Sequence, residues 1–403
     1  MKSSGGEIIV AGHVCLDIIP KFPDARFAGE ELLRPGKLTV VGPATIATGG
    51  SVSNTGIALN RLGVPTVLMG KVGDDLYGKA VLDILRSYGD EFVSGMSVVK
   101  GETTSYSIVI SPPGVDRMFL HCPGANDTFG KGDVDLSGLE SVKLFHLGYP
   151  PIMRRMFIDG GKELESIFRL ARERGMTTSL DMSMPDPASE SGRVDWKSLL
   201  ELVLPRVDVF LPSFEEVLFM LNRPLFDDLM SGRAARERAL ENGEILNRLA
   251  SDLIAMGAAI VGIKLGEDGF YLQTSGSSDR IGELGKCTPG DVEEWTGREL
   301  LAPCFKVDVA GTTGAGDSTI SGFLAGMVKG LDPEEAMISA VAVGAFNVEK
   351  ADATSGIPSW KVLQDRILAG WQMRPVCFGL SGWVKENAGR VWHGPRDGSR
   401  NVD

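Results

Sequence analysis

Cysteine, long apolar runs and positive charge are all scarce in this sequence, and each scarcity excludes a class of protein. Five cysteines are spread over 403 residues with no Cys-x-x-Cys pair among them: Cys15, Cys122, Cys287, Cys304 and Cys377. This pattern excludes a disulfide framework and a structural zinc site, and it favours a reducing, cytoplasmic location. No apolar run approaches the ~18–20 residues that cross a bilayer, and residues 1–20 lack the pattern of a signal peptide.

Basic residues are outnumbered by acidic ones. The chain has 41 Lys and Arg against 53 Asp and Glu, which gives a formal net charge of −12. Non-specific binding to nucleic acid or to an anionic membrane needs a net basic face, so we expect neither partner. A phosphorylated ligand would have to be bound by local backbone amides together with a metal ion. The four histidines also lack the spacing of metal ligands.

Glycine is abundant instead, with 51 residues, and strand-like apolar runs alternate with stretches of helical periodicity. The expected strands are Glu7–Gly12, Pro65–Val72, Lys143–Leu147, Thr177–Asp181, Val207–Leu211 and Ala259–Lys264, and the expected helices are Ser53–Leu62, Asp75–Tyr88, Lys162–Arg174, Phe214–Leu221 and Glu244–Met256. This order predicts an α/β fold with a doubly wound, mostly parallel sheet and helices on both faces. Ligands bind such sheets at the carboxyl ends of the strands.

Four segments interrupt this alternation. Arg26–Thr48 and Thr103–Cys122 do not fit a strand–helix–strand crossover, and the second has two alternating strands around a Pro-Pro-Gly turn. We interpret both as one small β subdomain that protrudes from the sheet. Asn222–Asn242 is rich in mixed charge and Ser275–Pro303 is rich in Gly and Ser, so both have the composition of surface insertions.

The strongest signal for a functional site lies at residues 307–330, which have the pattern of a strand, a glycine-rich turn and a helix. The turn consists of Thr312, Thr313, Gly314, Ala315 and Gly316. Its backbone amides converge at the positive end of a helix dipole, which predicts an anion pocket. Asp317 follows in the first helical turn, where a phosphate would repel it unless its task is to take a proton from an attacking hydroxyl. The alternative is a tight turn followed by a favourable first-turn acid.

A second group of polar residues lies near the N-terminus. Gly49 and Gly50 precede an expected helix that contains Asn54, and Asp17 follows the first expected strand. Paired glycines let a ligand approach the backbone closely, and an Asp with an Asn suits the hydroxyl groups of a sugar-like ligand. The alternative is a loop that ends in a helix N-cap.

Two further segments give weaker signals. Lys264, Gly266 and Gly269 end a strand and open an expected hairpin, which either lies against a nucleotide or is only a glycine turn. Ser213 and Glu216 follow another strand. Glu216 either orients a metal ion through water or is simply an acid in the first turn of a helix.

Several further short motifs accompany the two glycine-rich groups. They are Arg61-Leu62-Gly63, Gly70, Val72-Gly73-Asp74-Asp75 and Gly78 after the first group, then Gly124-Ala125-Asn126 and Gly356-Ile357-Pro358. With them, the two glycine-rich groups resemble the two signatures of the ribokinase-like (PfkB-type) carbohydrate kinases. The similarity runs from about residue 7 to 368. It implies a kinase domain over residues 1–370, a β-sheet lid from segments at about 13–50 and 95–125, and an extension of unknown role at 371–403.

The resemblance implies transfer of the γ-phosphoryl group of ATP, with Mg²⁺, to a hydroxyl group of a sugar or sugar acid. Asp317 would be the general base and Gly314, Ala315 and Gly316 the anion hole; Asp17, Gly49, Gly50 and Asn54 would contact the sugar; Lys264, Gly266, Gly269, Thr312 and Thr313 would line the nucleotide side; and Glu216 would be tied to the metal ion. Ser213 stands where the family has an Asn near that metal ion. Gly311 stands where it has an Asp associated with a monovalent cation, so we expect activity to depend on magnesium but barely on potassium.

Three functional hypotheses follow. A kinase for a sugar or sugar acid is the first, and a nucleoside kinase of the same fold is the second, because nothing in the sequence separates a pocket for a base from one for a sugar alone. The third is a sugar- or nucleotide-binding regulator without catalysis, against which the retained Asp317 argues. A small lid sheet leaves an exposed edge and an apolar face, so we also expect a homodimer joined through the lids.

Overall fold

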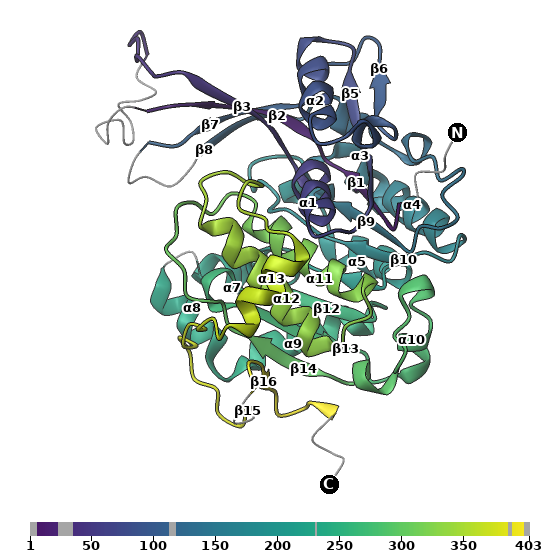
Figure 1. Cartoon of the computed structure of the whole chain (residues 1–403), viewed down its shortest axis with the longest axis vertical. Coiled ribbons are helices and arrows are strands. Elements are labelled where there is room, and N and C mark those ends of the chain that lie inside the picture. The colour runs from purple at the N-terminus through teal and green to yellow at the C-terminus, as the bar shows by residue number, and fades with distance from the viewer. Residues whose placement is uncertain (1–5, 23–34, 113–117, 230–231, 386–388, 399–403) are drawn as a thin grey trace.

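The computed structural model describes residues 6–22, 35–112, 118–229, 232–385 and 389–398. Within these ranges the chain forms a large sheet covered by helices and a smaller sheet that extends away from it (Figure 1). The predicted α/β fold with a separate small β subdomain is therefore confirmed.

The main sheet has ten strands among the described residues, in the order β15-β16-β14-β13-β12-β11-β10-β9-β1-β4. Its parallel part consists of β4 (Thr66–Met69), β1 (Ile8–Gly12), β9 (Leu144–Gly148), β10 (Thr177–Leu180), β11 (Val209–Phe210) and β12 (Ile260–Lys264). Antiparallel strands follow β12: β13 (Phe270–Thr274), β14 (Glu299–Ala302), β16 (Trp392–His393) and β15 (Val384–Lys385). The parallel strands are almost wholly buried, as expected when helices cover both faces of a sheet.

Two hydrophobic cores lie on opposite faces of the main sheet, because successive side chains of a strand point to opposite sides. On β1, Ile9 and Ala11 enter one core and Ile8 and Val10 the other. The first core is closed by α4 (Lys162–Arg172), α5 (Trp196–Val203), α6 (Phe214–Leu221) and α9 (Glu244–Ala255), and the second by α1 (Ser51–Arg61), α2 (Leu76–Arg86), α11 (Ala315–Val328), α12 (Pro333–Val348) and α13 (Trp360–Leu368). The five helices predicted from periodicity are all present, with small differences at their ends.

The smaller sheet has the order β3-β2-β7-β8, and we call it the lid. Its strands are β3 (Ala44–Gly49), β2 (Cys15–Pro20), β7 (Tyr106–Ile110) and β8 (Met118–Cys122). The β subdomain predicted from Arg26–Thr48 and Thr103–Cys122 is confirmed, although residues 23–34 and 113–117 lie outside the described part of the chain. Because β2 follows β1 after only two residues, the lid is attached at the carboxyl edge of the main sheet.

One predicted strand is in fact two. Pro65–Val72 was expected to be continuous, but β4 ends at Met69 and β5 (Lys71–Gly73) pairs with β6 (Ser97–Val99) in a sheet of its own. Gly70 separates β4 from β5, and it is a residue that weakens a strand and permits a bend.

Both segments predicted to be surface insertions contain helices or strands that pack into the fold. Asn222–Asn242 contains α7 (Arg223–Leu229) and α8 (Arg233–Leu240), which bury Phe226, Leu229 and Leu240 in the first core. Ser275–Pro303 contains the buried strand β14 of the main sheet. Charge and glycine dominate these compositions, but a few apolar residues on one side of a short element are enough to bury it.

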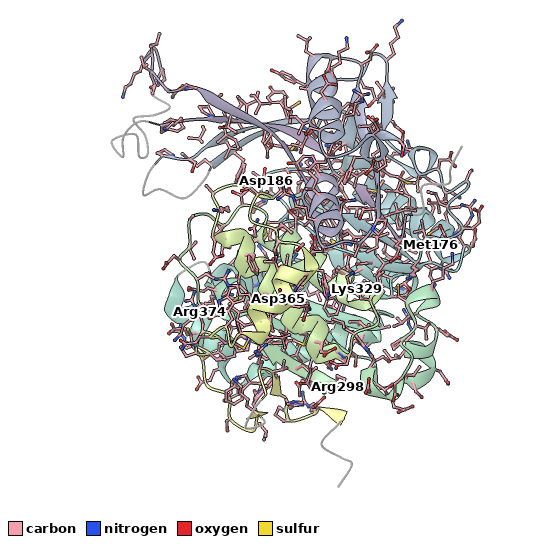
Figure 2. All side chains as sticks on the ribbon, in the orientation of Figure 1. Met176, Asp186, Arg298, Lys329, Asp365 and Arg374 are labelled. Carbon is pink, nitrogen blue, oxygen red and sulfur yellow. The ribbon has the colours of Figure 1, made fainter. Side chains whose placement is uncertain are left out.

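The tail after Trp371 also joins the main sheet. Its strand β16 pairs with β14, and β15 pairs in turn with β16. Arg298, labelled in Figure 2, forms a buried ion pair with Asp397 at 2.8 Å. Across the described residues, no helix combines the length and the apolar character needed to cross a membrane.

Candidate active site

The glycine-rich turn lies at the start of α11. Gly314 is the N-cap of this helix and has a φ of 71°, which glycine adopts without strain. A Cβ atom at Gly314 would lie 2.7 Å from the Cβ of Ala353, so the packing also excludes a side chain. A Cβ atom at Gly316 would meet nothing closer than the Lys264 Nζ at 3.7 Å. The turn therefore offers open backbone amides and an ammonium group to an anion.

Asp317 lies in the first turn of α11, and three side chains donate hydrogen bonds to its buried carboxylate. The Asn54 Nδ2 lies 2.9 Å from Oδ2, and the Thr55 Oγ1 lies 3.3 Å from Oδ1. The Tyr149 hydroxyl lies 3.0 and 2.9 Å from the two oxygens. Burial raises the pKa of Asp317 above its ordinary value, while the Asn54 bond, the nearby Lys264 ammonium and the other two bonds oppose this rise. The carboxylate is thus fixed in place and more basic than an exposed one.

Asn54 has a different environment from the one its predicted role suggests. We expected its amide to contact a sugar, but its nitrogen already donates to Asp317. Its Oδ1 has no hydrogen-bond partner among the described residues. Asn54 therefore orients the carboxylate and keeps one acceptor atom for a ligand.

Tyr149 was missed by the sequence interpretation. It directly follows β9 and has a φ of 68°, a conformation uncommon for a residue other than glycine and often found at functional sites. The available signal was its place after a buried parallel strand, at the edge of the sheet where ligands bind.

An ion pair lies beside the turn. Lys264 ends β12, Asp181 directly follows β10, and the Lys264 Nζ lies 2.6 Å from the Asp181 Oδ1. Burial by itself would lower the pKa of Lys264, but the carboxylates of Asp181, Glu216 and Asp317 raise it above its ordinary value. The amine therefore stays protonated. Asp181, which we had taken only as the end of a strand, is a second site residue that the sequence did not reveal.

Glu216 caps α6. Its Oε2 accepts a hydrogen bond from the Ser213 backbone amide at 2.7 Å, and the Ser213 Oγ accepts one from the Glu216 amide at 3.3 Å. This is a reciprocal capping box. Because Glu216 also lines the cavity described below, its structural role does not remove it from the site.

The lid forms the end of the site that lies opposite the glycine-rich turn. On β2, Asp17 accepts a hydrogen bond from the Cys15 thiol at 3.3 Å, and burial raises the pKa of Asp17. On the neighbouring strands, the Ser107 hydroxyl and the His121 Nδ1 lie 3.0 Å apart. His13 lies between two other rings, with its centroid 5.2 Å from that of His121 and 6.1 Å from that of Tyr149.

His13 is an unusual feature of this end. Both of its ring nitrogens lack a hydrogen-bond partner among the described residues, although the side chain is only 2% exposed. Burial, with a further contribution from His121, lowers the pKa of His13 well below its ordinary value. The ring is therefore neutral, and a polar group without a partner at such a position is costly unless a ligand satisfies it.

The two early glycines make room for these side chains. A Cβ atom at Gly49 would lie 2.2 Å from the Asp17 Oδ2, and one at Gly50, where φ is 90°, would lie 2.5 Å from the His13 Nδ1. We expected the glycines to admit a ligand to the backbone. Both glycines also make room for Asp17 and His13, and Gly50 lines the cavity described below.

A cavity of about 1090 Å³ joins the two ends. The predicted site residues that line it are Asp17, Gly50, Asn54, Glu216, Lys264, Gly266, Thr312, Thr313, Gly314, Gly316 and Asp317. Gly49, Ala315 and Gly269 do not line it. Gly269 packs against β14 instead, where a Cβ atom would lie 2.2 Å from the Ala302 carbonyl oxygen. Asp186, labelled below the lid strands in Figure 2, is on the rim of this cavity.

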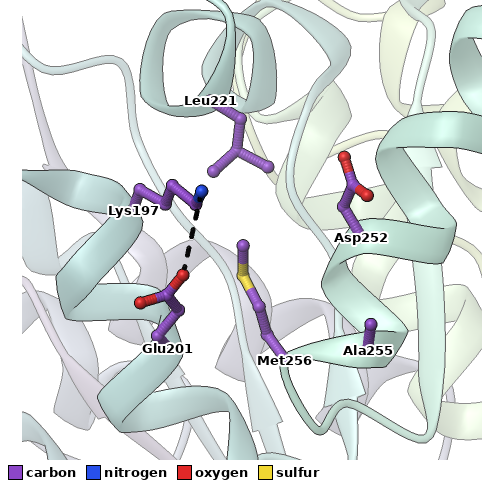
Figure 3. A pocket seen from close by; sticks show the side chains of 6 residues that line it. All are labelled: Lys197, Glu201, Leu221, Asp252, Ala255 and Met256. Atoms are coloured by element: carbon purple, nitrogen blue, oxygen red, sulfur yellow. Dashed lines mark ion pairs between the residues drawn. The ribbon is translucent and has the colours of Figure 1, made fainter.

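A second hollow, of about 570 Å³, lies between α5 and α9. It is lined by Lys197, Glu201, Leu221, Asp252, Ala255 and Met256 (Figure 3). Lys197 and Glu201 form an ion pair at 4.0 Å within it. None of these residues lines the larger cavity, and the hollow holds none of the predicted site residues.

The donor set at the turn fits a magnesium-bound phosphate. No group of three or more His, Cys, Asp or Glu in the described ranges is arranged to hold a metal ion alone. Asp181 and Glu216 nevertheless place carboxylates beside the turn and Lys264. Proteins usually bind Mg²⁺ with one or two carboxylates, leaving the other positions to phosphate oxygens and water.

Fold and site together define a class of protein, namely a kinase of ribokinase-like fold with a small β lid. Residues 8–360 match the family model described as pfkB family carbohydrate kinase, so the chain belongs to the pfkB family of carbohydrate kinases.

Individual relatives agree with this assignment. A sugar kinase of uncharacterised specificity from Archaeoglobus fulgidus is 30% identical over 306 residues, which cover 75% of this chain and 98% of the relative. A 2-dehydro-3-deoxygluconokinase from Thermoproteus tenax is 25% identical over 351 residues, covering 85% and 93%. The structure of a fructokinase with bound ATP from Xylella fastidiosa has the same fold, with a TM-score of 0.66, 18% identity, and coverage of 90% and 98%.

Proposed function

We propose that this carbohydrate kinase transfers the γ-phosphoryl group of ATP to a hydroxyl group of a sugar or sugar acid, with Asp317 as the general base. The observation that carries the proposal is the position of Asp317. Its carboxylate lies next to the anion-binding turn, in the same cavity as the polar side chains of the lid. Relatives named 2-dehydro-3-deoxygluconokinase and fructokinase support a sugar or sugar acid as the acceptor.

Asp317 would take the proton of the attacking hydroxyl group. Asn54, Thr55 and Tyr149 hold the carboxylate in one orientation, so it needs no rearrangement when the hydroxyl group arrives. Phosphoryl transfer has a loose transition state that depends on positioning and charge stabilisation more than on covalent help. A base of raised pKa is suited to accept the proton near neutral pH.

The residues at the end of the cavity that contains the glycine-rich turn fit a nucleotide. When bound, ATP with Mg²⁺ supplies the phosphoryl group and a divalent charge that neutralises it. The amides of Gly314 and Gly316 and the dipole of α11 would bind negative charge, and the protonated Lys264 adds a positive charge beside them. The Ala315 amide already donates to the Thr312 carbonyl at 3.3 Å. A side chain at Gly266 would meet open space, so the turn after β12 leaves room for the ligand. Glu216 and Asp181 would hold the metal ion.

The lid end would bind the acceptor. Asp17 can accept hydrogen bonds from two hydroxyl groups, and charge-assisted bonds are about twice as strong as neutral ones. The His13 ring and the Asn54 Oδ1, which have no hydrogen-bond partner within the described part of the chain, are further groups for hydroxyl contacts. A lid over this end would exclude water, which otherwise competes for the phosphoryl group.

A nucleoside acceptor is the second candidate. The observation that favours it is Phe119 on β8, which lines the cavity with 56% of its side chain exposed. An aromatic ring at this place offers a stacking surface to a base.

The test is ATP turnover with a panel of neutral sugars, sugar acids and nucleosides, with the phosphorylated product identified by ³¹P NMR. We expect product from at least one sugar or sugar acid, formed at least ~100-fold more slowly in Asp317→Asn under the same conditions. A product formed only from nucleosides would support the second candidate. ATP binding without a phosphorylated product from any acceptor would contradict both and favour a regulator.

We also propose a homodimer joined through the lids. Large apolar side chains are exposed on the two edge strands of this sheet: Ile46 on β3 and Met118 and Leu120 on β8. A second lid would cover them. Analytical ultracentrifugation at micromolar concentration should show a dimer that Leu120→Glu dissociates. A strictly monomeric wild-type protein would contradict the proposal.

A further inference from the structure

Residues 371–374 lie beyond the family match and contact two segments near the nucleotide end of the cavity. Phe305 and Met373 form an isolated antiparallel bridge. It is flanked by backbone hydrogen bonds from the Lys306 amide to the Gln372 carbonyl at 2.8 Å and from the Arg374 amide to the Cys304 carbonyl at 2.7 Å. This stretch therefore holds the start of the connection that leads from β14 to the glycine-rich turn.

The same stretch reaches the turn that carries Gly266. Arg374, labelled in Figure 2, forms an ion pair with Glu267 at 2.8 Å, and the Cys304 thiol donates to the Gly266 carbonyl at 3.3 Å. Glu267 lies in the single-turn helix Gly266–Asp268 after β12. Two backbone segments at one end of the cavity are thus joined by residues 371–374.

Trp371 anchors this stretch. Its ring stacks on Phe305 with the centroids 4.4 Å apart and an interplanar angle of 20°, and its Nε1 donates to the Lys306 carbonyl at 3.0 Å. Phe346 of α12 meets the same ring edge-on at 5.1 Å. On α13, the Arg366 guanidinium carbon lies 3.7 Å from the centroid of the Trp371 ring.

Arg366 links this stack to the back of the glycine-rich turn. Its guanidinium forms two hydrogen bonds of 2.7 Å with the carboxylate of Glu349. The segment around Glu349 packs against the turn. The Val348 carbonyl accepts from the Ala310 amide at 2.8 Å, and Ala353 lies against Gly314. Both ends of residues 304–314 are therefore held, and Trp371 and Arg366 connect the two supports.

We propose that residues 371–374 are a positioning segment for the nucleotide end of the cavity, with Trp371 as its anchor. The inference rests on the proposed function, which assigns Gly266 and the Thr312–Gly316 turn to ATP. Residues 371–374 are not among those that line the cavity, so they act through the backbone that they hold. A site made of backbone amides has few side chains that can adjust to a ligand. Its affinity therefore depends on how firmly the backbone is preorganised.

The test compares Trp371→Ala with Trp371→Phe in the full-length protein. Calorimetric titration with Mg-ATP in the absence of acceptor should show binding weakened by roughly tenfold in Trp371→Ala, about the effect of one lost aromatic stack. Trp371→Phe should recover most of that loss. The KM for the acceptor should stay within about twofold, because the lid end does not contact the stack. In the ligand-free protein, hydrogen exchange at the amides of 304–314 should be faster in Trp371→Ala only.

Trp392→Ala is the matched control. Trp392 belongs to the same extension and packs on the first core, but it pairs with Leu301 of β14 and not with residues 304–314. The Trp392→Ala substitution should lower the melting temperature without changing ATP affinity or hydrogen exchange at the amides of 304–314. If Trp371→Ala does not fold, Arg374→Ala removes the exposed link to Glu267 and should weaken ATP binding a few-fold.

Three outcomes would overturn the inference: equal loss of ATP affinity in Trp371→Ala and Trp392→Ala, unchanged ATP affinity in a folded Trp371→Ala, or unchanged exchange at 304–314. If the wild-type protein binds ATP but phosphorylates no acceptor, the proposed function fails while these comparisons still decide the role of Trp371. If the wild-type protein binds no ATP, the exchange experiment alone decides whether the segment orders the turn.

Discussion

The two ends of the cavity are built from different parts of the polypeptide. The proposed phosphate end is a backbone surface, formed by consecutive residues at the start of α11. The proposed acceptor end is a side-chain surface, assembled from Asp17 on β2, Asn54 on α1, Ser107 on β7 and His121 on β8. A substitution that strains the turn weakens ligand binding by the whole backbone site. A substitution in the side-chain site removes only one contact to the ligand. Asp317 belongs to both ends, because it follows the turn and is held by Asn54.

Substitution of Asp317 should have the largest effect, because the reaction between the ligands at the two ends depends on this carboxylate. Asp317→Asn keeps the size of the side chain but removes the proton acceptor, so kcat should fall by roughly 10²–10⁴. ATP affinity should change little, as measured by calorimetry. Asp365→Asn, at an exposed position of α13, is the control and should be fully active. Near-normal turnover in Asp317→Asn would remove this residue from the mechanism.

Asp17→Ala should affect only the acceptor end. A hydrogen bond to a charged group contributes about 1.5–3 kcal/mol, so the KM for the acceptor should rise by roughly 10- to 100-fold. ATP affinity should remain at the wild-type value. The measurement is a pair of steady-state titrations, one for each substrate. Equal losses for both substrates would show that Asp17 has a structural role.

Gly314→Ala should affect only the phosphate end. A residue other than glycine at this φ costs on the order of 1–3 kcal/mol, and the new Cβ would also clash with Ala353. We expect ATP affinity to fall by about tenfold with an unchanged acceptor KM. Gly330→Ala is the matched control, because Gly330 has a similar φ of 75° at the other end of α11, with nothing within 4 Å of its Cβ, and does not line the cavity. If both variants bind ATP equally well, the turn is not the phosphate site.

Tyr149→Phe should reveal the link between the two ends through the pH dependence of the reaction. Burial raises the pKa of Asp317, so kcat/KM should fall on acidification at a higher pH than for an ordinary carboxyl group. The Tyr149 bond opposes this rise, so its loss should move the acidic limb further toward neutral pH and lower the rate several-fold. Tyr88→Phe, at an exposed position, should leave the profile unchanged. An unshifted limb in Tyr149→Phe would mean that another group titrates.

Potassium should have the smallest effect. A Cβ atom at Gly311 would lie 2.9 Å from the Ala351 Cα and 3.0 Å from its carbonyl oxygen, so this backbone has no room for an acidic side chain. The turn is held instead by hydrogen bonds to the segment after α12, including one from the Thr313 Oγ1 to the Ala351 carbonyl at 3.5 Å. In choline chloride at constant ionic strength, added potassium should change the rate by less than about twofold, since no charged ligand stands at this position. A saturable, several-fold activation would contradict this expectation.

Short-range patterns in the sequence predicted the elements and the backbone half of the site. The glycine turn, the start of α11 and the place of Glu216 in the first turn of α6 each depend on residues within a few positions of one another. Apolar periodicity likewise located the buried parallel strands and the helices that cover them. Their hydrogen bonds and solvent exposure are local properties, so a local pattern is sufficient to predict them.

The tertiary structure decided which distant side chains meet. Tyr149, Asp181 and His13 each follow a different strand, and no pattern around any one of them indicates a partner. Only the parallel order of β1, β9 and β10 brings these three strand ends to the same edge of the sheet. The irregular tail is a similar case, because β16 becomes a strand by pairing with β14, about ninety residues earlier. Local sequence specifies local conformation, whereas contacts between distant residues depend on the path of the whole chain.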